Sequence, residues 1–78
     1  MPKFPVDAPK TKVIRAFEIL GFRVVREREH IAMRLDSGSE VRTLALLNHS
    51  RIKSSTLHRV CTQAGISRED FVRAYHRT

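Results

Sequence analysis

The feature that most constrains the fold of this chain is an alternating pattern that begins at residue 31. Apolar side chains occupy every second position there, namely Ile31, Met33 and Leu35. A period of two is typical of a half-buried β-strand, because successive side chains of a strand point to opposite faces. The intervening positions, which then share the other face, are His30, Ala32 and Arg34. The pattern therefore predicts a strand with one face toward a core and His30 on the open face.

A compact turn is expected directly after this strand, over residues 36–39. Its sequence is Asp-Ser-Gly-Ser, in which Gly supplies positive φ and the Asp and Ser side chains bond their own backbone. Residues 40–47 are therefore expected to return as an antiparallel strand. Upstream, residues 22–25 are consistent with a further strand. The charged run 26–29 is too polar to be buried, and we expect it to be an exposed connection that ends at His30.

A first helix is expected upstream of these strands. The prolines at positions 2, 5 and 9 favour an extended start of the chain, and a helix tolerates proline only in its opening turn. The helix should therefore begin near Pro9 or Lys10. Gly21 is expected to end it as a left-handed cap.

Two further helices are expected after the strands. The second should have Ser54 or Ser55 as its N-cap and end at Gly65, and the third should run over residues 68–77 with Ser67 as its N-cap. The chain is thus expected to have an α+β fold of the order α-β-β-β-α with a short extra C-terminal helix. Helices would cover one face of a three-stranded antiparallel sheet. The residues expected in the core are Val13, Ile14, Phe17, Leu20, Ile31, Met33, Leu35, Leu57, Val60 and Phe71.

The charge balance indicates a polyanionic partner. Fifteen Lys and Arg residues against eight Asp and Glu give a net charge of +7, and eleven of the fifteen are Arg. A strongly basic small domain is typical of nucleic-acid binding, and the guanidinium fork suits phosphate contacts. The single Cys61 excludes an internal disulfide, and no apolar run approaches the ~20 residues that span a bilayer. We therefore expect one cytoplasmic domain over residues 1–78, with no membrane association and no secretory signal.

Short blocks along nearly the whole chain match one known family in order and spacing. They are Met1-Pro2-Lys3, Lys12-Val13-Ile14-Arg15-Ala16, Gly21-Phe22, Val24-Val25-Arg26, His30-Ile31 with Met33 and Gly38, Ile52-Lys53, Thr56-Leu57, and Gln63-Ala64-Gly65-Ile66-Ser67-Arg68-Glu69. With these blocks the chain resembles the HicA (YcfA-like) mRNA interferase toxins, which have a double-stranded-RNA-binding-domain-like fold. The resemblance implies the toxin of a type II toxin–antitoxin system, an endoribonuclease acting on mRNA whose active face is covered by a HicB-type antitoxin.

The resemblance also implies a catalytic residue. In that family a Gly-Ser-His or similar tripeptide opens the second strand and carries the catalytic histidine, which His30 matches here. Arg28 and Glu29 replace the small residues before it, and Ala45 and Leu46 stand where a proline is common. The chemistry fits this assignment, because RNA supplies its own nucleophile in the 2′-hydroxyl. An imidazole can move the protons, and cations can stabilise the charge on the phosphate.

Further residues are expected to bind RNA around His30. They are Arg28, Arg34, His49, Arg51 and Lys53. No cofactor and no metal are expected, because the histidines at 30, 49, 58 and 76 and Cys61 lack the spacing of metal ligands.

Two other classes of function stay open. The same fold class includes non-catalytic RNA-binding modules that read backbone and 2′-hydroxyl groups. The segment around Gly65-Ile66-Ser67 also has the short Gly-containing turn of a DNA-binding helix-turn-helix. Glu69 and Asp70 oppose that hypothesis, because they fall where phosphate contacts would be made. Each histidine also has the plain interpretation of a solvated surface residue.

Overall fold

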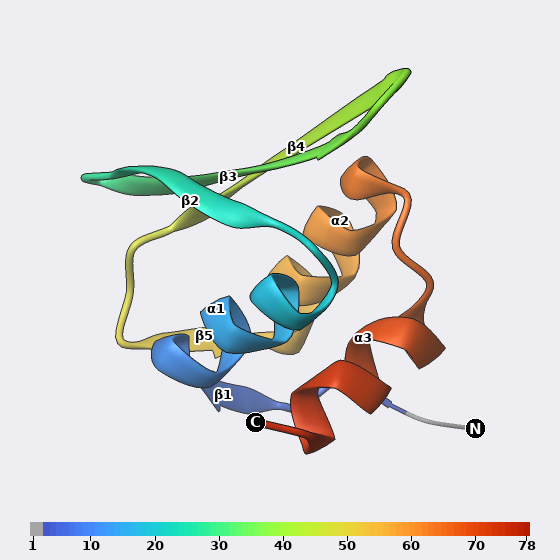
Figure 1. The fold of residues 1–78 in the computed structure, drawn as a ribbon. Helices are drawn as coiled ribbons and strands as arrows, with labels where there is room; N and C mark the ends of the chain where they lie inside the picture. The colour runs from blue at the N-terminus through green and yellow to red at the C-terminus, as the bar shows by residue number, and fades with distance from the viewer. Residues whose placement is uncertain (1–2) are drawn as a thin grey trace.

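The computed structural model describes residues 3–78, so the extended start expected at Pro2 lies outside the described residues. The elements in chain order are β1 (Asp7–Pro9), α1 (Lys10–Ile19), β2 (Arg23–Glu27), β3 (His30–Ser37), β4 (Glu40–Leu47), β5 (Arg51–Lys53), α2 (Ser54–Ala64) and α3 (Arg68–His76). Strands β2, β3 and β4 form an antiparallel sheet in that order, with the helices on one side of it (Figure 1). The expected α+β fold with a three-stranded sheet is therefore confirmed.

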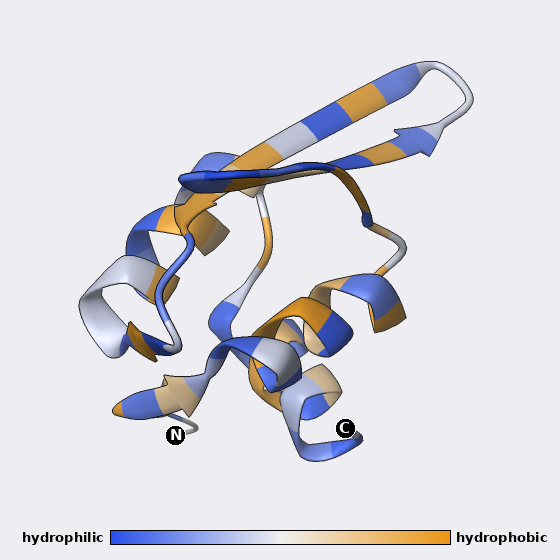
Figure 2. Cartoon of the chain, turned by 90° about the vertical axis from the view of Figure 1, so that its left-hand side faces the viewer, coloured by the Kyte–Doolittle hydropathy of each residue, from blue (hydrophilic) through white to orange (hydrophobic). Residues whose placement is uncertain are grey.

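The β3–β4 hairpin separates its side chains between two faces. Its register runs from His30 opposite Leu47 to Ser37 opposite Glu40. Ile31 and Met33 are fully buried against the helices, whereas His30 is exposed on the open face, as the alternation predicted. The alternation along β3 is visible in Figure 2. The turn is shorter than expected, because β3 continues through residue 37 and only Gly38, at φ +70°, and the residue after it close the hairpin.

Strand β2 is longer than the sequence indicated. Arg26 and Glu27 were expected in an exposed connection, yet their backbone pairs with β3, opposite Ala32 and Ile31. That expectation was wrong because an edge strand can pair through its backbone while charged side chains stay in water. The register shifts next to Val25, which forms a bulge on this edge and is 53% exposed. Residues 28 and 29 alone make the connection to β3.

A second, two-stranded sheet was not expected from the sequence. Strand β1 pairs antiparallel with β5, and its central pair, Ala8 and Ile52, is buried. This ribbon lies on the far side of α1 from the three-stranded sheet (Figure 1). Strand β5 lies in the polar segment after Leu47, where a three-residue strand is too short to show a period in the sequence.

The helix ends agree with the sequence in most places. Helix α1 starts at Lys10 after Pro9, and Gly21, with φ +103°, follows its last turn. Gly65 caps α2 in the left-handed conformation. Ser54 and Ser55 do not cap that helix, because the chain enters it directly from β5 and Lys53 takes the N-cap position without a side-chain bond.

Helix α3 begins with the cap that the sequence predicted. The Ser67 hydroxyl oxygen accepts a hydrogen bond from the Asp70 backbone N–H at 3.1 Å. The helix ends at His76, one residue earlier than expected, with Arg77 as its C-cap.

One hydrophobic core lies between the three-stranded sheet and the helices. Seven of the ten core residues expected from the sequence are buried in it, and the other three, Ile14, Leu20 and Leu35, are partly buried and pack against it. Phe17 is central, with its ring centroid 5.1 Å from that of Phe71. Cys61 lies in this core, and burial raises the pKa of its thiol to about 12, which makes it a packing residue rather than a nucleophile. Within residues 3–78, no helix has the length and apolar character needed to cross a membrane.

Candidate functional site

His30 opens β3 on the face of the sheet that no helix covers. Its side chain is exposed and borders a shallow hollow together with three charged residues, Arg26, Arg28 and Glu29. The two arginines come from the end of β2 and from the connection that follows it. His30 is therefore a solvent-accessible imidazole with two guanidinium groups beside the same hollow.

The connection that precedes His30 is held in place by Asn48. The Asn48 side-chain amide donates to the Arg28 carbonyl oxygen at 2.7 Å, and its backbone N–H donates to the Glu29 carbonyl oxygen at 3.0 Å. The Asn48 side-chain oxygen in turn accepts from Lys10 Nζ at 2.7 Å. These bonds join the connection to the start of α1, so the backbone before His30 has a fixed course. The sequence offered no specific signal for this role, since Asn is common in any loop.

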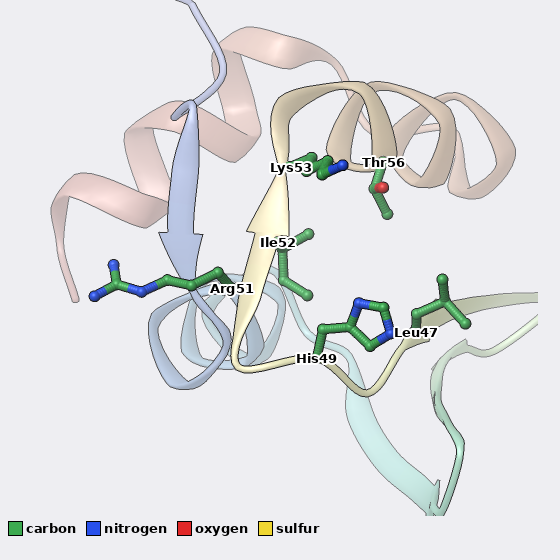
Figure 3. A pocket seen from close by; sticks show the side chains of 6 residues that line it. All are labelled: Leu47, His49, Arg51, Ile52, Lys53 and Thr56. Carbon is green, nitrogen blue, oxygen red and sulfur yellow. The ribbon is translucent and has the colours of Figure 1, made fainter.

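A second hollow of about 200 Å³ adjoins the same end of the sheet (Figure 3). Its lining residues are Leu47, His49, Arg51, Ile52, Lys53 and Thr56. Leu47 connects this hollow with the first, because it is the β4 residue opposite His30. The structure thus places His49 and Lys53 at one hollow, and it places Leu47 of that hollow opposite His30 in the sheet.

Arg51 lines this hollow, but its guanidinium group is not directed into it. Its side chain extends away from His49 and Lys53 and crosses β1 (Figure 3). The guanidinium donates to the Asp7 carbonyl oxygen at 3.2 Å, which ties β5 to β1. Arg51 and Lys53 thus line the same hollow, but the guanidinium of Arg51 is directed toward β1 instead of toward Lys53.

Arg34 also lies apart from His30. Both residues are on the open face, but they are four positions apart along the strand, a distance of about 13 Å. Arg34 Nε contacts an Asp36 carboxylate oxygen at 3.1 Å, and Arg23 contacts the other oxygen at 3.5 Å. One carboxylate thus offsets part of the positive charge at this end of the sheet.

The other cations that line the two hollows differ from Arg34 and Arg51 in their contacts. Within residues 3–78, the side chains of Arg26, Arg28 and Lys53 form no ion pair and no hydrogen bond. All three are exposed. Their charge is therefore available to an anion that approaches either of the two hollows.

Residues 3–78 offer little support for a metal site or for a DNA-binding helix-turn-helix. No three His, Cys, Asp or Glu side chains between residues 3 and 78 are grouped as a metal would require. For a helix-turn-helix, the exposed first turn of α3 presents Glu69 and Asp70, which would repel DNA phosphates. Tight binding of duplex DNA in a gel shift would be needed to support that function.

The chain was compared with models of protein families, with curated proteins and with solved structures, and none of the three comparisons gave a match. The resemblance to HicA toxins therefore stays a prediction from the residues quoted above.

Proposed function

We propose that this chain is a metal-independent endoribonuclease that cleaves mRNA as the toxin of a type II toxin–antitoxin system, with His30 as its catalytic residue. The observation that carries the proposal is the position of His30, which is exposed at the start of β3 and lines a hollow with Arg26 and Arg28. Its cross-strand partner Leu47 lines the hollow of Lys53. The resemblance to HicA toxins assigns catalysis to the same residue.

The chemistry follows from the substrate. The 2′-hydroxyl of RNA attacks the adjacent phosphorus, and the bond from phosphorus to the 5′-oxygen breaks, which leaves a 2′,3′-cyclic phosphate and a 5′-hydroxyl. An imidazole that is partly protonated near neutral pH can transfer a proton in this step, an effect of about 10² to 10⁴ in rate. Arg26, Arg28 and Lys53 would stabilise the charge that develops on the phosphate.

The residues that depart from the HicA pattern are compatible with this function. Arg28 and Glu29 stand where small residues are usual, but the bonds from Asn48 use their carbonyl oxygens. The course of the connection therefore does not depend on small side chains, and both side chains are exposed to solvent. Arg28 adds a cation where the substrate carries negative charge.

The test is His30→Ala in the purified chain. Because His30 is exposed, we expect the free energy of unfolding to change by no more than ~0.5 kcal/mol. RNA cleavage should fall ~10²-fold or more through loss of proton transfer. His76→Ala, which alters an exposed histidine on α3, is the matched control and should keep full activity. Cleavage should persist in a chelator and stop on RNA with a deoxyribose at the scissile position.

A non-catalytic RNA-binding module is the second candidate. The observation that favours it is the placement of Lys53 and Thr56 at the start of α2, since basic residues at the start of the last main helix meet phosphates in that fold class. RNA binding without any cleavage by the unmodified chain would select this function. Cleavage that is unchanged in His30→Ala would remove His30 from the proposed mechanism.

The proposed antitoxin partner would cover the open face. That face carries His30, and the sheet also exposes Val41 and Leu47, at 52% and 40%. A HicB-type protein bound there should block cleavage and protect these residues. Stable copurification of the two chains, lost on Leu47→Asp, would support the pairing.

A further inference from the structure

Cleavage by the 2′-hydroxyl requires two proton transfers. One group takes the proton of the attacking hydroxyl, and another gives a proton to the departing 5′-oxygen. A single imidazole cannot be both proton-free and protonated in one step. We infer that His49 is the second proton-transfer residue, acting with His30 on a phosphodiester that lies over Leu47. This inference rests on the proposed function and adds a catalytic residue to it.

The backbone places both histidines close to Leu47, since His30 is its partner across the sheet and His49 follows it two residues later. His30 and Leu47 are direct cross-strand partners, which places their Cα atoms about 5 Å apart. The His49 N–H donates to the Leu47 carbonyl oxygen at 2.9 Å, so the chain bends tightly there. Since two residues span at most ~7 Å, the Cα atoms of the two histidines are no more than about 12 Å apart. Figure 3 shows the His49 ring directed toward Leu47.

Asn48 fixes the spacing of the two backbone segments that carry the histidines. It precedes His49 in the chain, and it bonds both carbonyl groups of the connection that precedes His30. The segment that carries one histidine is thus bonded directly to the segment that carries the other. Reacting groups held in this way lose little freedom on binding substrate, which is a large part of catalytic rate enhancement.

The second hollow also has the groups that a phosphate needs. Lys53 and Thr56 flank it on the side opposite His49, and their polar ends point toward each other (Figure 3). Lys53 is exposed and forms no ion pair with any residue from 3 to 78. Leu47 is 40% exposed and provides an apolar surface for a ribose or base in the hollow that His49 lines.

No other side chain beside the hollows is as suitable for the second transfer. In general a lysine is almost fully protonated and a carboxylate almost fully ionised near neutral pH, whereas an imidazole is substantially present in both forms. In the proposed step, one imidazole accepts the 2′-hydroxyl proton as the new oxygen–phosphorus bond forms. The other, as imidazolium, gives its proton to the 5′-oxygen as that bond to phosphorus breaks. The step neither consumes nor releases a proton overall, and exchange with water then restores both histidines.

The test compares His49→Ala and His49→Gln with the unmodified chain, His30→Ala and the control His76→Ala on one short RNA. Because His49 is exposed, both variants should keep the melting temperature of the unmodified chain. We expect kcat to fall ~10²-fold with little change in KM. The bell-shaped dependence of rate on pH in the unmodified chain should lose one limb in both variants, because one titrating group is gone.

A substrate with sulfur in place of the bridging 5′-oxygen identifies which histidine donates a proton and which accepts one. A thiolate leaves without a proton, so loss of the proton donor is tolerated on this substrate while loss of the proton acceptor is not. We expect only one of His30→Ala and His49→Ala to regain rate on it. Recovery of one variant and not the other supports the pair.

The outcomes separate this inference from the proposed function. One outcome is that His30→Ala is inactive while both His49 variants keep kcat and the bell-shaped dependence of rate on pH. In that case His49 is not the second proton-transfer residue, and the proposed function stands. A rise in KM alone would make His49 a binding residue and would also overturn the pair. Failure of the unmodified chain to cleave RNA would overturn both.

Discussion

The two faces of the three-stranded sheet differ although the same strands build both. On the inner face Ile31 and Met33 have no exposed surface, and Leu44 and Leu46 of β4 are almost as deeply buried. On the open face the intervening residues remain accessible, His30 among them. Because the side-chain period of a strand is two, one residue along the chain separates a packing role from a chemical one. Stability and activity should therefore respond to substitutions at different positions of the same strand.

The largest expected effect is that of Ile31→Ala, which removes a buried side chain from the inner face. Removing a fully buried Ile side chain leaves a cavity and should cost about 2 to 5 kcal/mol of unfolding free energy. That is a large fraction of what a small domain has. Urea denaturation gives the value, with the neighbouring His30→Ala as the control that should stay within ~0.5 kcal/mol. Equal losses in the two variants would show that the faces are not distinct.

A smaller effect concerns how the free energy of unfolding depends on pH, and it tests the burial of Cys61 in the core. The folded protein keeps the Cys61 thiol protonated up to about pH 12, whereas in the unfolded chain it ionises near its ordinary value of 9.0. The stabilisation is therefore fully present below pH 9 and is lost as pH rises from 9 toward 12, by about 1 kcal/mol per pH unit. Denaturation of Cys61→Ala should lack this contribution. Rapid labelling of the native thiol at pH 8 would contradict the burial.

Arg42 tests the difference between the two faces, because it is a charged residue on the inner face, opposite Leu35. Its guanidinium reaches the C-terminal end of α2 and donates to the carbonyl oxygens of Ala64 and Gly65 at 3.3 and 3.1 Å. Arg42→Ala should therefore cost about 1 kcal/mol of unfolding free energy. Arg23→Ala, which removes only an exposed ion pair with Asp36, should change it by less than ~0.5 kcal/mol. Thermal melts that rank the two variants in the opposite order would contradict this role.

The smallest effect concerns charge on the open side. Lys53 lacks an ion pair within residues 3–78, so Lys53→Ala should lower the log–log salt slope of single-stranded RNA binding by ~0.7. Arg34→Ala should lower it less, because Asp36 already contacts that guanidinium. Anisotropy titrations on an RNA that carries a deoxyribose at the scissile position would measure both slopes. Equal slopes for the two variants would argue against a phosphate site at Lys53.

Much of this arrangement could be predicted from local sequence. The alternation at 31–35 and the Gly-containing turn gave β3 and β4, with the bounds of β4 correct at both ends. Ser67 and Gly65 marked their helix ends because each acts through its own local backbone. The exposure of His30 follows from the same alternation.

The rest depends on contacts between distant parts of the chain. Strands β1 and β5 have three residues each and exist because they pair with one another. The role of Asn48 depends on Arg28 and Lys10, which lie 20 and 38 positions away. Arg51 could be placed on the correct segment, but the direction of its side chain is set by a carbonyl oxygen at residue 7. No periodicity in one segment contains such information.

The β1–β5 ribbon has a consequence for the order of folding. The β3–β4 hairpin closes across a two-residue turn, whereas the ribbon joins residues such as Asp7 and Arg51 that are 44 positions apart. Closing the longer loop costs more chain entropy, so the hairpin should form early and the ribbon late. The same order predicts that amide protons of the ribbon exchange with solvent sooner than those of β3 and β4. Lys53 would then be positioned only in the last stage of folding, after His30 already has its place in the hairpin.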